Sequence, residues 1–191
     1  MLDNLNKYDI VLASNSPRRR ELLGQLGVKF RVETIKGLDE SYDPSMPVNE
    51  VAAYLSQLKA SAYSLAANEL IITADTVVIC AGEVMGKPVD RDDAYRMIRA
   101  LSGRTHVVIT GVTVATRDKK ETFSNVTEVT FAPLTDEEIY HYIDDYRPYD
   151  KAGAYGIQEW IGYMGITGIN GCYYNVMGLP VNHLYTLLKT F

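Results

Sequence analysis

The chain has 191 residues, of which 47% are hydrophobic and 23% charged, a composition that suits one globular domain or two small lobes with a real core. Its formal net charge of −5 argues against a general role in binding nucleic acids or membrane surfaces, because such proteins present a broad basic face. Any site for an anion must therefore be local.

The first predicted elements are a short buried strand at residues 8–13 and the helix that follows it. Ser16 is a suitable N-cap, and Pro17 fits the first helical position, where its missing N–H costs no hydrogen bond. The three arginines at 18–20 then occupy the first turn, where the helix dipole disfavours each cation by roughly 0.3–1 kcal/mol. This arrangement predicts an external anion at the helix N-terminus. The junction carries neither a Walker motif nor a dinucleotide-binding fingerprint.

The middle of the chain alternates strands and helices. A second strand is predicted at 30–34, a polar loop at 35–47, and a helix from Val48 to about Ala67. An apolar strand follows at 70–80, and a single carboxylate, that of Asp75, interrupts it. A carboxylate in a buried strand is costly unless a cation or several donors reach it.

In the second half of the chain, a turn is predicted at 81–83 and a helix at 90–101, followed by a hairpin of two strands at 105–116 and 121–132. A capping box of Thr135 and Glu138 opens the next helix. Glycine-rich turns with short strands follow, and a helix at 181–191 closes the chain. Strands that alternate with helices and strands that pair in hairpins are both present. The predicted fold class is therefore mixed α/β.

Asp75 is interpreted as a metal ligand or a general base at the lip of a cleft. The alternative is a structural aspartate at the end of the strand, bonded to the amides of a neighbouring loop. Two lysines strengthen the functional interpretation: Lys59 on the flank of the 48–67 helix, and Lys87 just past the turn that follows the strand. Taken alone, each lysine, like Glu40 in the polar loop, is typical of a solvated surface charge.

The segment DKAGAYGIQ, residues 150–158, is a candidate binding loop. Gly153 and Gly156 allow a positive φ or a close approach of the backbone, so a ligand could lie directly on it. The side chain of Gln158 offers one donor and one acceptor, a pair that could recognise the edge of a pyrimidine base. The alternative, that Gln158 only satisfies local backbone groups, fits the composition equally well.

The histidines, the cysteines and the chain's hydropathy give weaker indications of function. The three histidines (His106, His141, His183) form no H-x-x-x-H pair, so we do not expect a zinc site. Cys80 and Cys172 lie far apart and are predicted to be reduced and buried. No apolar run approaches the ~20 residues that span a bilayer, and the first residues lack the core of a signal peptide, so the expected location is the cytoplasm.

Six segments together resemble the Maf family of nucleoside triphosphate pyrophosphatases: ASNSPRRREL, ADTVV, GKP, LSGRTH, DKAGAYGIQ and YYNVMGLP. They occur in the order of the family and cover residues 1–191 as a single domain. The resemblance implies an α/β fold of the Maf/ITPase type, in which helices flank an elongated mixed sheet and two lobes surround a deep cleft. It also implies hydrolysis between the α- and β-phosphates with Mg²⁺ or Mn²⁺, and it is compatible with a homodimer.

By motif match, the resemblance assigns the proton-acceptor role to Asp75 and the loop acid to Glu40. The remaining matches are the two cleft lysines, Lys59 and Lys87, and the phosphate-facing residues Ser14, Arg18 and Arg19. Asp75 and Glu40 are the expected metal ligands, because Mg²⁺ and Mn²⁺ prefer oxygen donors.

Three positions (Arg18, Thr76 and Gln158) resemble the dTTP/UTP pyrophosphatase branch of this family. Glu159 and Trp160 depart from that branch, which usually has glycine after the glutamine, and this leaves the base preference open. The role expected for such an enzyme is the clearing of non-standard nucleotides or the arrest of cell division. One alternative is a pyrophosphatase for another modified or purine nucleotide. The other is a non-catalytic nucleotide-binding regulator of cell division.

Overall fold

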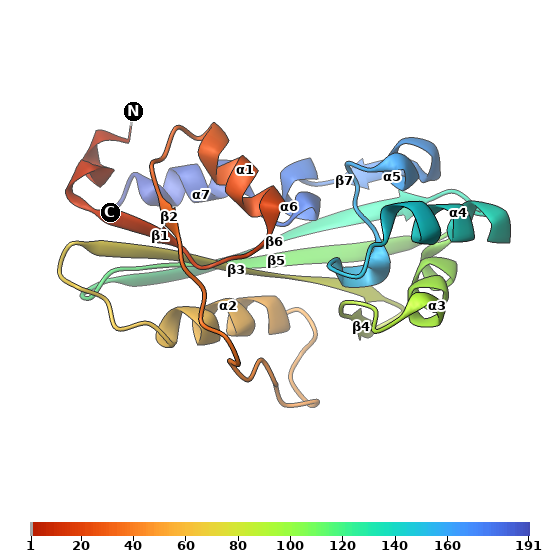
Figure 1. The fold of residues 1–191 in the computed structure, drawn as a ribbon, viewed down its shortest axis with the longest axis horizontal. Helices are drawn as coiled ribbons and strands as arrows, with labels where there is room; N and C mark the ends of the chain where they lie inside the picture. The colour runs from red at the N-terminus through yellow and green to blue at the C-terminus, as the bar shows by residue number, and fades with distance from the viewer. Residues whose placement is uncertain (1) are drawn as a thin grey trace. The chain divides into compact units, whose positions relative to one another are not determined.

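The computed structural model describes residues 2–191 and contains one mixed sheet. Its strands are β1 (Asp9–Leu12), β2 (Arg31–Val32), β3 (Glu69–Cys80), β4 (Glu83–Met85), β5 (Thr105–Ala115), β6 (Lys120–Phe131) and β7 (Ile166–Asn170). The strand order is β2-β1-β3-β5-β6-β7, and β4 pairs with β3. β1 runs parallel to β2 and β3, whereas β4 and β7 run antiparallel to their neighbours (Figure 1).

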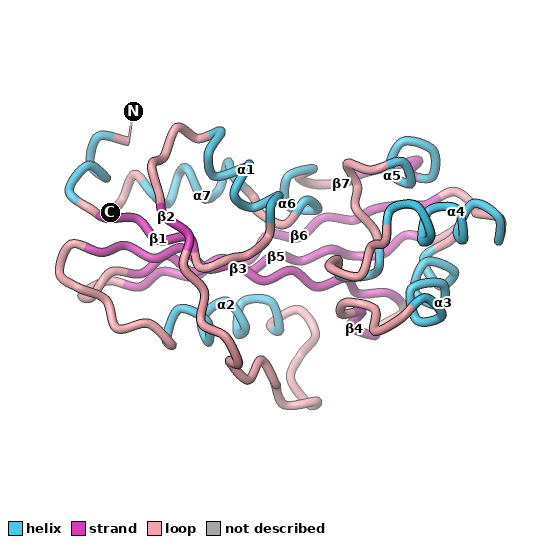
Figure 2. Tube along the Cα trace, in the orientation of Figure 1, coloured by secondary structure: helices cyan, strands magenta, loops and turns pink. Residues whose placement is uncertain are grey.

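Helices alternate with these strands along the chain (Figure 2). The α-helices are α1 (Pro17–Gln25), α2 (Val51–Ser61), α3 (Arg91–Leu101), α4 (Asp136–Tyr146), α5 (Trp160–Gly165), α6 (Tyr173–Met177) and α7 (Val181–Leu188), and the 3₁₀ helices are η1 (Asp3–Lys7) and η2 (Ala152–Ala154). The predicted mixed α/β class is therefore confirmed.

The chain folds into two compact units. Unit 1 comprises the chain up to Asp75, together with Thr110–Asn125 and Gly178–Phe191, and unit 2 comprises Thr76–Ile109 and Val126–Met177. The long strands β3, β5 and β6 contribute residues to both units. Within unit 1, α1 and α7 cover one face of the sheet and α2 covers the other (Figure 1).

In unit 1, α2 lies unusually close to β5. A Cβ added to Gly111 of β5 would lie 2.4 Å from the backbone of Ala52, so only glycine permits this packing. Polar contacts then fix the helix along the strands: the hydroxyls of Ser56 and Thr113 lie 2.8 Å apart, and Thr73 Oγ1 donates to the Ser56 carbonyl at 2.6 Å. The last turn of α2 is therefore held against β3.

The core of unit 2 lies between α3, α4 and the strands beside them. Its fully buried side chains include Ile98, Leu101, Phe131, Ile139, Tyr142 and Ile143. Asp90 caps α3 by accepting from the backbone of Asp93, and the predicted capping box of Thr135 and Glu138 is present on α4. These local signals place both helix starts where the sequence predicts them.

The predicted helix over residues 48–67 is too long. The structure ends α2 at Ser61, because Tyr63 and Leu65 leave the helix and pack on an apolar cluster of unit 1 formed by Val11, Ala13, Ile71 and Ala115. The Tyr63 hydroxyl also donates to the Glu33 carbonyl at 2.9 Å. Long-range packing therefore overrides the helical pattern at this point.

Two other boundaries differ from the prediction. The strand expected at 30–34 is reduced to β2, and the closing helix ends at Leu188. In the C-terminal part, the predicted short strands are mostly helices: α5 and α6 form there, and β7 is the one strand of the part from 147 to 180.

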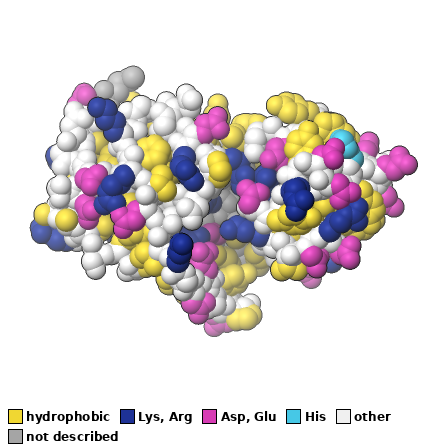
Figure 3. Space-filling view, in the orientation of Figure 1, with side chains coloured by type: hydrophobic (Ala, Val, Ile, Leu, Met, Phe, Trp, Pro, Cys, Tyr) yellow, Lys and Arg dark blue, Asp and Glu magenta, His cyan; other side chains and the backbone are white. Residues whose placement is uncertain are grey.

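The surface carries charges of both signs. On the face drawn in Figure 3, basic and acidic side chains are interspersed, and neither sign forms a broad patch. No helix in residues 2–191 combines the length and apolar character needed to cross a membrane.

Candidate active site

The loop between β1 and α1 is organised by two serines. Ser16 caps α1 through its side chain, which accepts from the backbone N–H of Arg19 at 3.4 Å, and Pro17 occupies the first turn as predicted. The hydroxyl of the buried Ser14 accepts from the Ser16 N–H at 3.2 Å. The loop is thus fixed before any ligand binds, with the helix N-terminus at its end.

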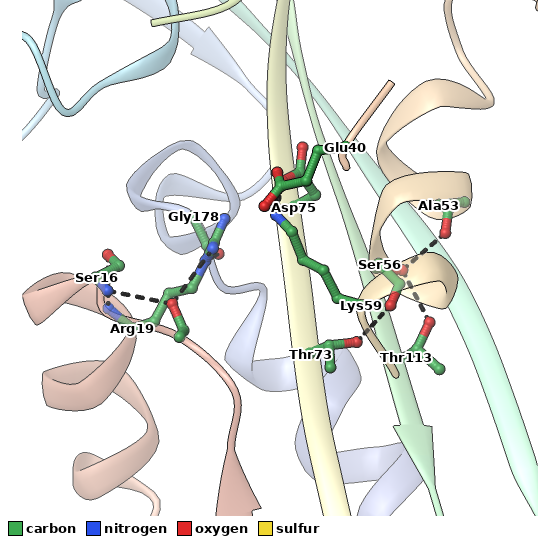
Figure 4. Close-up of polar contacts among 11 residues, drawn as sticks. Ser16, Arg19, Glu40, Ala53, Ser56, Lys59, Thr73, Asp75, Thr113 and Gly178 are labelled. Carbon is green, nitrogen blue, oxygen red and sulfur yellow. Dashed lines mark hydrogen bonds and ion pairs between the residues drawn. The ribbon is translucent and has the colours of Figure 1, made fainter. Parts of the chain in front are cut away.

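Arg19 is held in a defined position beside this loop. Its Nε donates to the Gly178 carbonyl at 2.8 Å (Figure 4). Its Nη1 lies 3.5 Å from the Ser14 hydroxyl. Burial lowers the pKa of Arg19, whereas the negative charges of Asp75 and Glu40 raise it. The guanidinium is therefore within electrostatic reach of both carboxylates.

Lys59 joins these two carboxylates. Its Nζ lies 2.5 Å from Asp75 Oδ1 and 2.9 Å from Glu40 Oε2. The side chains of Lys59 and Asp75 are only 17% and 16% exposed, whereas that of Glu40 is 48% exposed, so the group is open to solvent on the Glu40 side. In Figure 4 the three side chains converge from α2, β3 and the loop before α2.

Strand geometry explains this convergence. Side chains two residues apart in a strand point to the same face, so Asp75 shares the face of Thr73, which bonds to α2. Lys59, near the end of α2, therefore supplies the cation that a buried carboxylate needs. The alternative of a strand-end aspartate bonded to loop amides is wrong, because Asp75 lies inside β3 and pairs with a lysine.

The other predicted site residues fall in different places. Arg18 lies half-buried in the first turn of α1. Lys87, Thr76 and Gln158 belong to unit 2, and Lys87 is exposed. Their grouping with Asp75 stays a prediction.

Within unit 2, the 150–158 loop is bonded to the segment that carries Lys87. The backbone N–H of Gly153 donates to the Gly86 carbonyl at 3.0 Å. Gly153 has φ +68°, and a Cβ there would lie 2.9 Å from the side chain of Val78, so glycine is required. The close approach predicted for this loop thus exists, but at Gly153 the partner is a side chain of β3.

Gln158 carries an unsatisfied polar atom. Its Oε1 is buried and accepts no hydrogen bond within the described part of the chain. The interpretation that Gln158 only satisfies local backbone groups therefore fails for this atom. A buried acceptor without a donor is costly, and a ligand that supplies an N–H would remove the cost.

Sequence reasoning missed a network next to Gln158. Lys151 Nζ lies 3.1 Å from Glu159 Oε1, and the Tyr142 hydroxyl donates to Glu159 Oε2. Trp160, the other departure from the family pattern, packs edge-on against His141. The only signal in the sequence was the unusual Glu159 itself.

Lys59, Glu40 and Asp75 form a cluster whose carboxylate oxygens are the donors available to the predicted divalent cation. The described residues contain no group of three or more His, Cys, Asp or Glu side chains that could hold a metal. Glu40 and Asp75 offer two carboxylates, and Mg²⁺ in nucleotide sites is held by one or two carboxylates, phosphate oxygens and waters. These residues therefore fit a cation that binds together with a triphosphate.

Comparisons with known proteins show what the chain is similar to. The family model for Maf-like proteins matches residues 9–191. The chain is 57% identical over 191 residues to a dTTP/UTP pyrophosphatase of Phocaeicola vulgatus, with 99% of each chain covered. It is 56% identical to a dTTP/UTP pyrophosphatase of Parabacteroides distasonis, with 100% of each chain covered.

A solved structure shares the fold. A HAM1 protein from Coxiella burnetii aligns with 96% of this chain and 100% of its own, with a TM-score of 0.51 and 14% sequence identity. At this identity the likeness concerns the architecture alone.

Proposed function

Because the chain belongs to the Maf family, we propose that it hydrolyses nucleoside triphosphates between the α- and β-phosphates, releasing a nucleoside monophosphate and pyrophosphate. The names of the relatives point to dTTP and UTP as the substrates. The nucleotide is the proposed partner and the cytoplasm the proposed location, and the family resemblance is compatible with a homodimer.

The observation that carries this proposal is the position of Lys59 between Asp75 and Glu40, within electrostatic reach of Arg19. A triphosphate would bind at the N-terminus of α1, where the positive end of the helix dipole, Ser14 and Arg19 favour phosphate oxygens. The negative charge of the substrate would also offset the clash between the arginines and the helix dipole.

Asp75 is the proposed general base. Its Oδ1 is paired with Lys59, which orients the carboxylate, and the carboxylate would accept a proton from the attacking water. Lys59 and Arg19 would stabilise negative charge that develops on the phosphates. A Mg²⁺ or Mn²⁺ ion held by Glu40 and Asp75 would neutralise further phosphate charge when bound.

Gln158 is the proposed base reader. A uracil or thymine ring presents an N–H donor between two carbonyl acceptors, and a glutamine amide can accept from that donor and donate to one carbonyl. The buried, unsatisfied Oε1 of Gln158 supports this role. We assign further substrate contacts to Thr76, Arg18 and Lys87 because these residues match the family motifs.

A nucleotide panel tests the proposal. The purified chain is given dTTP, UTP, CTP, ATP and GTP, with and without Mg²⁺, and monophosphate and pyrophosphate are measured. We expect pyrophosphate from dTTP and UTP, and only with Mg²⁺. Preference for a purine would support the alternative substrate class, orthophosphate would contradict the assigned bond, and binding without turnover would support a regulator.

A further inference from the structure

Glu159 is held by two partners from different parts of unit 2. Both of its carboxylate oxygens are engaged, Oε1 by the ammonium of Lys151 at 3.1 Å and Oε2 by the hydroxyl of Tyr142. Lys151 also contacts Asp150 at 2.7 Å. The side chains of Lys151 and Glu159 are 8% and 21% exposed, and Tyr142 is fully buried. We call Glu159, Lys151 and Tyr142 the clamp.

The direction of each hydrogen bond in the clamp is fixed. Burial and the hydrogen bond to Glu159 raise the pKa of Tyr142, so its hydroxyl stays protonated. A phenol has one hydrogen, and Tyr142 donates it to Glu159. The same oxygen accepts from the backbone N–H of Gly156 at 3.0 Å. Tyr142, which lies on the rigid helix α4, therefore bonds to both ends of the short turn 156–159.

That turn carries Gln158. The Glu159 N–H donates to the Gly156 carbonyl at 3.0 Å, which closes the turn. A Cβ added to Gly156 would lie 2.9 Å from Glu159 Cδ and 3.1 Å from Gln158 Nε2. The amide of Gln158 and the carboxyl group of Glu159 thus pack against the same Cα, and the clamp sets the surface on which the amide rests.

Stability alone is a weak reason for such an arrangement. A buried ion pair often stabilises a fold less than apolar residues of the same volume, because both charges lose their hydration. What the pair provides is a single geometry, since two oxygens, one ammonium and one hydroxyl satisfy each other in only one arrangement. Base recognition by one amide requires this kind of fixed geometry.

We propose that Glu159, Lys151 and Tyr142 are positioning residues that hold the Gln158 amide in the orientation that selects a pyrimidine base. This inference rests on the proposed function and concerns only the choice of base. In this proposal the clamp acts on the choice of base and has no role in hydrolysis at the phosphates. Its loss should therefore change selectivity while leaving the hydrolytic step intact.

The test uses Tyr142→Phe, which removes one hydroxyl and little volume. The ratio of kcat/KM for dTTP to that for GTP is measured, together with the ratio of their dissociation constants from calorimetry, which requires no turnover. We expect the dTTP preference to fall about tenfold, equivalent to about 1.4 kcal/mol, through a higher KM for dTTP and little change in kcat. Tyr146→Phe, at a half-exposed tyrosine on the same helix, is the matched control and should change neither ratio.

A second pair of variants decides the question if Tyr142→Phe does not fold. Glu159→Ala should lower the preference as much as Tyr142→Phe, and Glu159→Gln, which keeps the shape and an acceptor, should restore part of it. Ratios within about twofold of wild type in folded Tyr142→Phe or Glu159→Ala would overturn the inference, as would an equal loss on all nucleotides. A wild-type chain that turns over no nucleotide would instead refute the proposed function, and the dissociation constants would still test the clamp.

Discussion

The ammonium group of Lys59 lies 2.5 Å from Oδ1 of Asp75, so the acid inside β3 is paired with a cation from the helix packed on that strand. The pair exists because Gly111 lets α2 approach the sheet and because Ser56 and Thr73 fix the helix along it. The position of one charged side chain thus depends on close backbone packing several residues away.

Replacing Asp75 with asparagine should abolish turnover and keep the fold. Asparagine has nearly the same volume and can still accept from Lys59, but it cannot take a proton from water. We expect pyrophosphate release to fall by about 10²–10⁴-fold, the usual contribution of a general base. The measurement is pyrophosphate release from dTTP, with a thermal melt to verify folding.

The matched control for this variant is Asp118→Asn, at an exposed aspartate in the turn between β5 and β6. It should keep wild-type turnover. Near-normal turnover of Asp75→Asn would remove Asp75 from the role of base.

Replacing Lys59 with methionine tests the cation. Methionine keeps the length of the side chain but leaves the carboxylates of Asp75 and Glu40 without their shared partner. We expect kcat to fall by about 10²-fold or more, because charge stabilisation in the transition state is lost. Steady-state kinetics with dTTP measure the effect, and Lys29→Met, at an exposed lysine, should leave it unchanged. An active Lys59→Met variant would show that the ion pair is only structural.

Replacing Gln158 with alanine tests base recognition. The variant removes the buried Oε1 that finds no donor in the described residues, so stability should change little or rise. The ratio of activity on dTTP to activity on GTP should fall by about tenfold, because one good polar contact contributes about 1–2 kcal/mol to discrimination. A nucleotide panel with a thermal melt measures both quantities. An unchanged ratio would exclude Gln158 as the base reader.

Part of the fold could be predicted because its signals are local. Ser16 with Pro17, and Thr135 with Glu138, mark helix starts through hydrogen bonds that span only a few residues. The end of α2 could not be predicted, because it depends on Tyr63 packing against strands distant in the sequence. Helical periodicity carries no information about such contacts.

The candidate site could also be predicted only in part. Asp75 stood out because a carboxylate inside an apolar strand requires a partner, but the strand does not say which residue that partner is. Lys59 was a candidate from its place on the helix flank, and Glu40 gained its role from the family resemblance. In the structure the Lys59 ammonium contacts both Glu40 and Asp75. Glu159 stood out in the sequence only as a departure from the branch pattern that left the base preference open. In the structure its carboxylate contacts Lys151 and Tyr142. The residue that departs from the family pattern, Glu159, is thus the one that forms the network with Lys151 and Tyr142.

Replacing Gly111 with alanine should disrupt unit 1. The new methyl group would lie 2.4 Å from the backbone of Ala52, and neither backbone segment can move without displacing α2 from the sheet. We expect a loss of about 3 kcal/mol or more in the free energy of unfolding, and lower turnover because Lys59 moves with α2. Chemical denaturation and pyrophosphate release measure the two effects.

Gly24→Ala in α1, where nothing lies within 4 Å of the new Cβ, is the control and should instead stabilise the chain by about 0.5–1 kcal/mol. Equal stability of the two variants would contradict the close packing.

Stability should fall between about pH 6.5 and pH 4 because of one imidazole. His106 is buried against Phe131 and bonded to the Tyr155 hydroxyl at 2.7 Å, and burial lowers its pKa from 6.5 to about 4. Within this window the unfolded chain binds a proton that the folded chain does not, so acid favours unfolding. The loss amounts to about 3 kcal/mol, is absent above pH 6.5, and grows no further below pH 4. Urea denaturation at several pH values measures the free energy of unfolding of wild type and of His106→Gln. The difference between the two gives the contribution of His106, because the titration of carboxylates is common to both. Parallel profiles of wild type and His106→Gln would show that His106 does not stay neutral in the folded chain.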